Sequence, residues 1–342
     1  MFGGKKARIL DSITFAFLAL VVWLQIFPPA DKANAQVGSL ALVSLGLLIL
    51  GFFVSLALNK SGVKTLGESV FEPPFRKAET APTPLLKSFW GWQLLVAFLA
   101  AFYVGLLVTE FDFYDLTDED GINGARRIFG ALLSPNFEIL PSAILAIVET
   151  IFIAFMATTL SIPVAFILAF FAAKNIIGTN PMGFAVYATL RTLLNVSRSI
   201  EPLIWAIIFS VWVGIGPFAG MLALMLHSIA SLTKQYSEMI ESVDEGPIEG
   251  IASTGANRTQ TVWFGVVPQI ILPYVSFTIY RWDINVRMAT IIGLVGGGGI
   301  GTMLIHYQGQ ALWHEVGCIV AVIAVVVWSM DTASAYIREA LK

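Results

Sequence analysis

Five charged residues stand inside otherwise apolar segments, where they could bind an ion or a ligand. Arg198 and Glu201 lie in one segment, and Arg281, Asp283 and Arg287 lie in another. An arginine at membrane depth costs about 2.5 to 3.5 kcal/mol on insertion scales, so each needs a partner or water. Asp283 and Arg287 are one helical turn apart and can pair, which leaves Arg281 on a different face.

Two interpretations of these charges stay open. Pairing of the arginines with Glu201 and Asp283 would be purely structural. Alternatively, the excess of three arginines over two carboxylates leaves a net positive environment, which suits an anion with tetrahedral oxygens. The sequence does not decide between ligand contact and structural pairing.

The composition around these charges is that of an integral membrane protein. Apolar residues make up 57% of the 342 residues and charged residues 13%, and the mean hydropathy is +0.79. A soluble domain with a solvated surface would not reach these values. The apolar runs are long and show no ten-residue alternation, so they predict helices and not the strands of an outer-membrane barrel.

Few residues are suited to catalysis. The single cysteine, Cys318, lies in an apolar run, and His227, His306 and His314 have no metal-ligand spacing. No G-x-x-x-x-G-K-[ST] phosphate loop is present, and no nucleophile and base stand together at membrane depth. We therefore expect no enzyme activity, no metal and no bound cofactor. An ion channel is disfavoured because no acidic ring or repeated pore motif lies within a span.

The distribution of Lys and Arg predicts eight membrane crossings with both termini in the cytoplasm. Basic residues precede the first span, cluster between the second and third, and follow later spans at Lys174, Lys234 and Arg338. The predicted spans are Ile13–Phe27, Val37–Leu58, Phe89–Val108, Ala143–Ala173, Phe184–Val213, Phe218–Leu232, Pro268–Ile292 and Ala311–Ala335. Ala33-Asn34-Ala35 also fits a signal-peptidase site, so cleavage of the first span is an alternative.

A change in composition predicts two parts. Residues 1–135 are expected to be an N-terminal extension of three transmembrane helices with an external acidic loop that runs from Glu110 to Asp120. Residues 136–342 are expected to form the second domain. A polar segment near 241–268 interrupts its apolar runs, and the crossing count places this segment in the cytoplasm.

Local signals in this polar segment predict two short helices joined by a sharp corner. Pro247 suits the first position of a helix, and Gly255 suits the left-handed residue that ends it. Asn257 and Gln260 have capping-box spacing and predict a second helix that runs toward Pro268.

The segment resembles the cytoplasmic coupling loop of ABC-importer permeases, whose signature is E-A-A, a Gly, and an apolar run ending in Pro. Glu249-Gly250-Ile251 stands at E-A-A with two departures from alanine, and Gly255 and Gly265-Val266-Val267-Pro268 match the rest. From about Glu149 onward the chain is similar to the permease subunit of the phosphonate ABC importer, within the type I importers. The matching stretches are 213–220, 245–250, 254–257, 268–269, 280–287 and 293–301. Asp283 stands where the family commonly has Glu, and Gly297 replaces a usual Ala.

The resemblance implies an all-α type I importer permease with extra N-terminal helices, located in the inner membrane. Its expected partners are a second permease copy, a cytoplasmic ATPase dimer that carries ATP and Mg, and a periplasmic or lipid-anchored phosphonate-binding protein, with no nucleic acid. It implies ATPase-coupling residues Glu245, Pro247, Glu249, Gly255, Asn257 and Pro268, translocation-path candidates Arg198, Glu201, Arg281, Asp283 and Arg287, and an extracytoplasmic glycine loop with Gly296, Gly298, Gly299 and Gly301.

The expected function is ATP-driven import of phosphonate or a related phosphorus oxyanion. The alternative is a type I permease for another small solute, such as phosphite, methionine or a quaternary amine. A structural or assembly protein is the third hypothesis, and the first three spans alone would suit it. The sequence does not indicate what these added helices contact.

Overall fold

The computed structural model describes residues 2–26, 37–71, 84–177 and 180–341, and these residues contain helices and no strand. They divide into two compact units, 1–118 and 119–342. The suggested peptidase site at Ala33-Asn34-Ala35 lies outside the described residues. The boundary expected at 135/136 stays a prediction, and α7, which precedes it, groups with the second unit.

The first unit is held together by a buried carboxylate on its first helix. Asp11 is 1% exposed and accepts hydrogen bonds from Thr65 Oγ1 (2.5 Å), the Gly67 amide (2.7 Å) and Ser55 Oγ (3.2 Å). These donors come from other helices or their caps, so one side chain joins the unit. Its helices are α1 (Phe2–Ile26), α2 (Val37–Lys60), α3 (Leu66–Val70), η1 (Leu85–Lys87), α5 (Phe89–Val108) and α6 (Phe113–Thr117).

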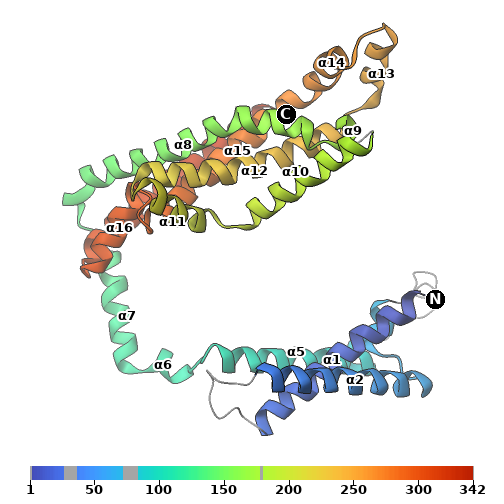
Figure 1. Ribbon diagram of the computed structural model, residues 1–342. Helices are drawn as coiled ribbons and strands as arrows, with labels where there is room; N and C mark the ends of the chain where they lie inside the picture. Colours follow the sequence, from blue (N-terminus) through green and yellow to red (C-terminus); the bar gives the residue numbers. More distant parts are fainter. Residues whose placement is uncertain (1, 27–36, 72–83, 178–179, 342) are drawn as a thin grey trace. The chain divides into compact units, whose positions relative to one another are not determined.

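The second unit is a helical bundle in which α8, α12 and α15 lie side by side (Figure 1). Three of its helices begin with a proline, a residue preorganised for a first helical turn. Its elements are α7 (Glu119–Leu132), η2 (Phe137–Ile139), α8 (Leu140–Phe171), α9 (Lys174–Ile177), α10 (Pro181–Ser199), α11 (Pro202–Val213), α12 (Pro217–Glu241), α13 (Glu245–Ser253), α14 (Arg258–Thr261), the π-helical turn η3 (Val262–Val266), α15 (Val267–Gly293), α16 (Gly299–Gly309) and α17 (Trp313–Ala340).

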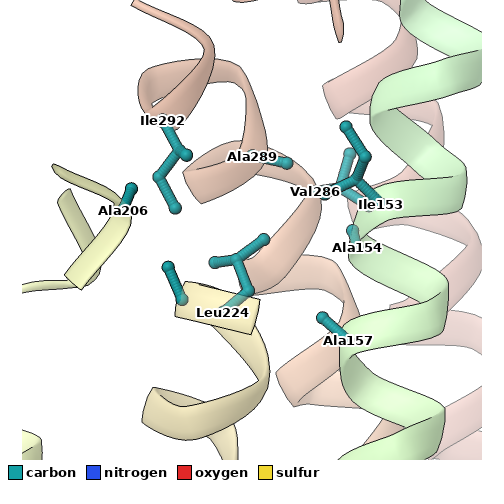
Figure 2. Close-up of a cluster of buried hydrophobic side chains, with 9 residues drawn as sticks. Ile153, Ala154, Ala157, Ala206, Leu224, Val286, Ala289 and Ile292 are labelled. Carbon is teal, nitrogen blue, oxygen red and sulfur yellow. The ribbon is translucent and has the colours of Figure 1, made fainter. Parts of the chain in front are cut away.

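Small side chains bring these helices close together. Ala154 and Ala157 of α8 face Leu224 of α12 and Ala289 of α15 in one buried cluster (Figure 2). Without a hydrophobic driving force in lipid, close backbone approach through small residues is a main source of helix association. The cluster therefore fixes the three central helices against one another.

Six helical segments of the described chain are long and apolar enough to cross a membrane, or seven if a bent pair counts as one span. The bent pair is α10 and α11, which meet at 90° beside Pro202. Helix α12, which carries His227 and Lys234, is not among the six. The count of eight crossings therefore stays a prediction.

Candidate functional site

The predicted polar corner is present and is built from local hydrogen bonds. Asp244 caps α13 by accepting from the Gly246 amide (3.1 Å), so the helix begins two residues earlier than the sequence suggested and Pro247 is its third residue. Gly255 follows the helix end with φ +84°, a backbone conformation that favours glycine. This confirms the predicted helix stop.

The predicted capping box is also confirmed. Asn257 Oδ1 accepts from the Gln260 amide, and Gln260 Oε1 accepts from the Asn257 amide, both at 2.9 Å. Helix α14 continues through the π-helical turn η3 into α15, and Trp263 and Phe264 of that turn are 59% and 62% exposed. The corner thus presents apolar side chains on a rigid support.

Gln269 fastens α13 to the beginning of α15, a role that the sequence did not reveal. Its Oε1 accepts from the Asp244 amide (3.0 Å), while its Nε2 donates to the carbonyls of Asp244 (3.2 Å) and Gly265 (2.7 Å). Gly265 also lies against Ile248, whose Cα is 3.3 Å from the position that a Cβ would take. Helix α13 is therefore bonded directly to the start of α15.

An ion-pair network supports the same end of the bundle. Glu241, the last residue of α12, accepts from Arg191 Nη1 of α10 (2.8 Å) and from the Lys174 amide of α9 (2.9 Å). Arg191 also lies 3.6 Å from Glu238 and donates to the Ala172 carbonyl (3.2 Å). The network thereby links α9, α10, α12 and Ala172, the residue that ends α8.

A cleft of about 440 Å³ opens beside α13. Its lining includes Asn175, Glu241, Glu245, Ile248, Glu249 and Arg258. Glu245 and Glu249 are exposed on α13, one turn apart, and give this wall a negative charge. The corner formed by residues 244–269 is therefore held by internal hydrogen bonds, protruding (Figure 1) and acidic on one side. We call it the coupling element after the role that the family resemblance predicts for it.

The charged residues of α15 separate into two environments. Arg287 bonds to Asp283 Oδ2 (2.6 Å), as the helical spacing predicted, and also to Asp331 Oδ1 of α17 (2.7 Å). Asp331 is 44 residues away in sequence, and no local signal connects it with Arg287. Asp283 is thus ion-paired with Arg287 and is not the counter-charge of Arg281.

Arg281 is 7% exposed and has no ion pair within the described chain. Its Nε donates to Ser228 Oγ (3.1 Å) of α12, which also accepts from Asn285 Nδ2 (2.8 Å). Asn285 Nδ2 in turn donates to Thr158 Oγ1 of α8 (2.8 Å). A polar chain therefore crosses the three central helices and ends at a buried arginine.

Arg198 and Glu201, near the α10–α11 bend, are exposed and form no ion pair with any described residue. The sequence suggested Glu201 as a counter-charge, and the structure does not bring it to an arginine. The five translocation-path candidates thus divide into one ion-paired group, one buried unpaired arginine and one exposed pair of residues.

The glycine loop connects α15 to α16 at the opposite end of the bundle from the coupling element (Figure 1). Gly296 and Gly298 have φ +88° and +80°. The Ile300 amide donates to Thr150 Oγ1 of α8 (2.8 Å), and a Cβ at Gly220 of α12 would lie 2.5 Å from the Gly297 carbonyl oxygen. The loop follows a helix and not a strand, which argues against a nucleotide-binding turn.

This arrangement is that of a multi-pass helical membrane protein with a protruding polar corner. Residues 161–342 match the family described as binding-protein-dependent transport system inner membrane component, and the chain belongs to this family. It is the permease subunit of an ABC importer, a multi-pass inner membrane protein and not an enzyme. Such systems include a separate ATPase and a binding protein, and permeases of this family bind no cofactor of their own.

Relatives that are named as transport permeases support this assignment. The chain is 35% identical to a phosphite transport system permease protein of Stutzerimonas stutzeri, over 72% of this chain and 86% of the relative. It is 34% identical to a phosphate-import permease protein of Mycolicibacterium smegmatis (63% and 40% covered) and 38% identical to a putative cryptic phosphonate transport system permease protein of Escherichia coli K12 (35% and 98% covered).

The fold is that of type I ABC importer permeases. A chain of the MetNI methionine ABC transporter in an inward-facing conformation superposes with a TM-score of 0.52 at 19% identity, covering 60% of this chain and 99% of that one. At this identity the similarity concerns the fold and not the transported solute.

Proposed function

We propose that two copies of this chain form the translocation path for phosphonate or a related phosphorus oxyanion across the inner membrane. The observation that carries this proposal is the similarity to relatives named for phosphite, phosphate and phosphonate transport. Phosphite, considered above among the alternative solutes, is itself a phosphorus oxyanion and joins this class. The arginine content of the membrane segments is consistent with an anionic solute.

Methionine is the alternative that retains some support, from relatives at 25% and 26% identity that are named for methionine transport. It is less favoured because the relatives named for phosphorus oxyanions are 34–40% identical. A zwitterion also provides no net charge for a buried arginine.

In this proposal the coupling element faces the cytoplasm and docks on an ATPase that binds ATP and Mg. Its corner is built by Glu245, Pro247, Glu249, Gly255 and Asn257, and Pro268 is the second residue of α15. The hydrogen bonds of Gln269 to Asp244 and Gly265 support this role, because closure of an ATPase dimer can tilt the membrane helices only through a rigid contact. The glycine loop then faces the periplasmic or lipid-anchored binding protein.

We propose that residues 136–342 form the permease domain and that residues 1–135 form an N-terminal extension with three transmembrane helices. The buried polar centre at Asp11 supports an independent fold for the helices before residue 118. Transport itself is assigned to the C-terminal domain.

Uptake by the reconstituted complex tests the proposed function. Proteoliposomes would contain the full chain and its ATPase, with binding protein and ATP supplied, and would be offered phosphite, methylphosphonate, phosphate, sulfate, methionine and choline in turn. Uptake of a phosphorus oxyanion that depends on both binding protein and ATP is expected. Transport of methionine or choline without any phosphorus oxyanion would overturn the substrate assignment.

A further inference from the structure

Arg281 lies deep in the bundle without a balancing negative charge. It stands 14 residues after Val267, the first residue of α15, which is about 21 Å along a helix of 27 residues. Its Nη2 atom is buried and has no hydrogen-bond partner among the described residues. Among the described residues, the guanidinium donates through Nε to the neutral hydroxyl of Ser228.

The surroundings of Arg281 add positive charge and neutral polar groups. Arg198 of α10 adds positive charge within electrostatic range of it, and His227 of α12 is a polar neighbour whose Nδ1 has no hydrogen-bond partner among the described residues. The Asn285 amide and Ser228 hydroxyl next to it are fully buried, and Asn285 Oδ1 also has no partner. Within the part of the chain that the structure describes, the nearby carboxylates Asp283 and Asp331 are both bonded to Arg287.

A purely structural role does not explain this arrangement. An unpaired buried charge destabilises a fold, and an apolar residue of similar size at such a position is neutral or stabilising. Arg287, on the same helix, shows the structural solution, because it bonds to two carboxylates at 2.6 and 2.7 Å. Arg281 is instead oriented through Nε by the chain Ser228–Asn285–Thr158, which leaves its outer nitrogen without a partner.

We propose that Arg281 is the residue that binds the anionic solute inside the membrane, with Ser228 and Asn285 as the positioning residues that orient its guanidinium. This inference rests on the proposed function and extends it from a class of solute to a residue. The guanidinium presents paired N–H donors that match two oxygens of a tetrahedral oxyanion.

The test compares two methionine variants on one helix. Arg281→Met removes an unpaired charge, so the melting temperature of the purified permease–ATPase complex should stay equal or rise by about 2 °C or more. Uptake of phosphite or methylphosphonate should nevertheless fall about tenfold or more, the usual effect of losing a charged hydrogen bond. Arg281→Lys, which keeps the charge, should retain more uptake than Arg281→Met.

Arg287→Met is the matched control. It leaves Asp283, which is 3% exposed, without its cation, so the melting temperature should fall. Hydrogen exchange of the α13 amides should be the same in Arg281→Met as in wild type, because the hydrogen bonds of the coupling element are unchanged. This readout separates loss of solute binding from loss of coupling.

Two results would overturn the inference: wild-type uptake by Arg281→Met, or a fall in its melting temperature comparable to that of Arg287→Met. Failure of the proposed function is recognised separately, from the solute panel with the wild-type complex. If wild type carries sulfate instead of a phosphorus oxyanion, the same variant ratio measured with sulfate decides the role of Arg281. If wild type carries only methionine or choline, both proposals fail.

Discussion

Replacement of Gln269 tests whether the coupling element works as a rigid body. Gln269→Leu keeps the side-chain volume and removes three hydrogen bonds, two to Asp244 and one to Gly265. A typical hydrogen bond contributes about 0.5 to 1.5 kcal/mol net, so a half-buried set of three should contribute about 2 to 3 kcal/mol. That changes the ratio of docked to detached α13 by roughly 30- to 140-fold.

The assay measures solute imported per ATP hydrolysed, together with hydrogen exchange of the α13 amides. Gln269→Leu should insert normally, exchange faster at residues 245–253 and import less solute per ATP. Gln269→Glu should be intermediate, because its carboxylate still accepts from the Asp244 amide but no longer donates to either carbonyl. The matched control is Gln310→Leu at the other end of the bundle, where the amide contacts only the His306 ring.

If hydrogen exchange of the α13 amides were unchanged in Gln269→Leu, Gln269 would not be what holds α13 against α15. Faster exchange with an unchanged ratio of solute to ATP would refute the mechanical role, since a loosened element would then transmit motion as well as a rigid one.

Three further predictions concern other parts of the chain. Gly255→Pro should uncouple ATP hydrolysis from uptake without loss of membrane insertion, because proline fixes φ near −65° whereas Gly255 has φ +84°. Glu249→Lys should have the same effect, because it reverses a charge on the acidic wall of the cleft. Wild-type uptake by both variants would contradict the docking role. Asn257→Cys should react with an impermeant thiol reagent only after cells are opened, and labelling of intact cells would place the coupling element outside. Asp11→Leu should destabilise the N-terminal unit by about 2 to 3 kcal/mol, because the Thr65 hydroxyl and Gly67 amide lose their acceptor, and limited proteolysis of the full chain that matched wild type would argue against this.

The features predicted correctly from sequence are those specified by neighbouring residues. A positive φ at Gly255 and the reciprocal cap of Asn257 and Gln260 each depend on a few adjacent positions, so residue type was sufficient. The start of α13 was placed two residues late because Asp244 is the stronger signal: its carboxylate caps the helix, and proline is tolerated in the first turn.

The features that were missed depend on contacts between distant segments. Asp331 reaches Arg287 from another helix, and Gln269 reaches Asp244 across 25 residues. The sequence identified Arg281 as unusual, but its Ser228 partner is 53 residues away and carries no distinguishing signal. Periodicity predicts which face of a helix is buried, whereas the neighbour on that face is set by the packing of the whole bundle.

The packing of the glycine loop has a consequence for how force travels through the permease. Because the Thr150 hydroxyl accepts from the Ile300 amide and the loop backbone lies against Gly220, the loop joins α8 to the first turns of α12 and α16, and we expect this contact to act as a fulcrum. Helix α12 has 25 residues and is about 37 Å long, so a tilt of about 10° at this fulcrum would swing its far end through roughly 6 Å. A small rotation at the glycine loop would thereby become a displacement of several ångströms at the end of α12 that carries Glu241, next to the coupling element.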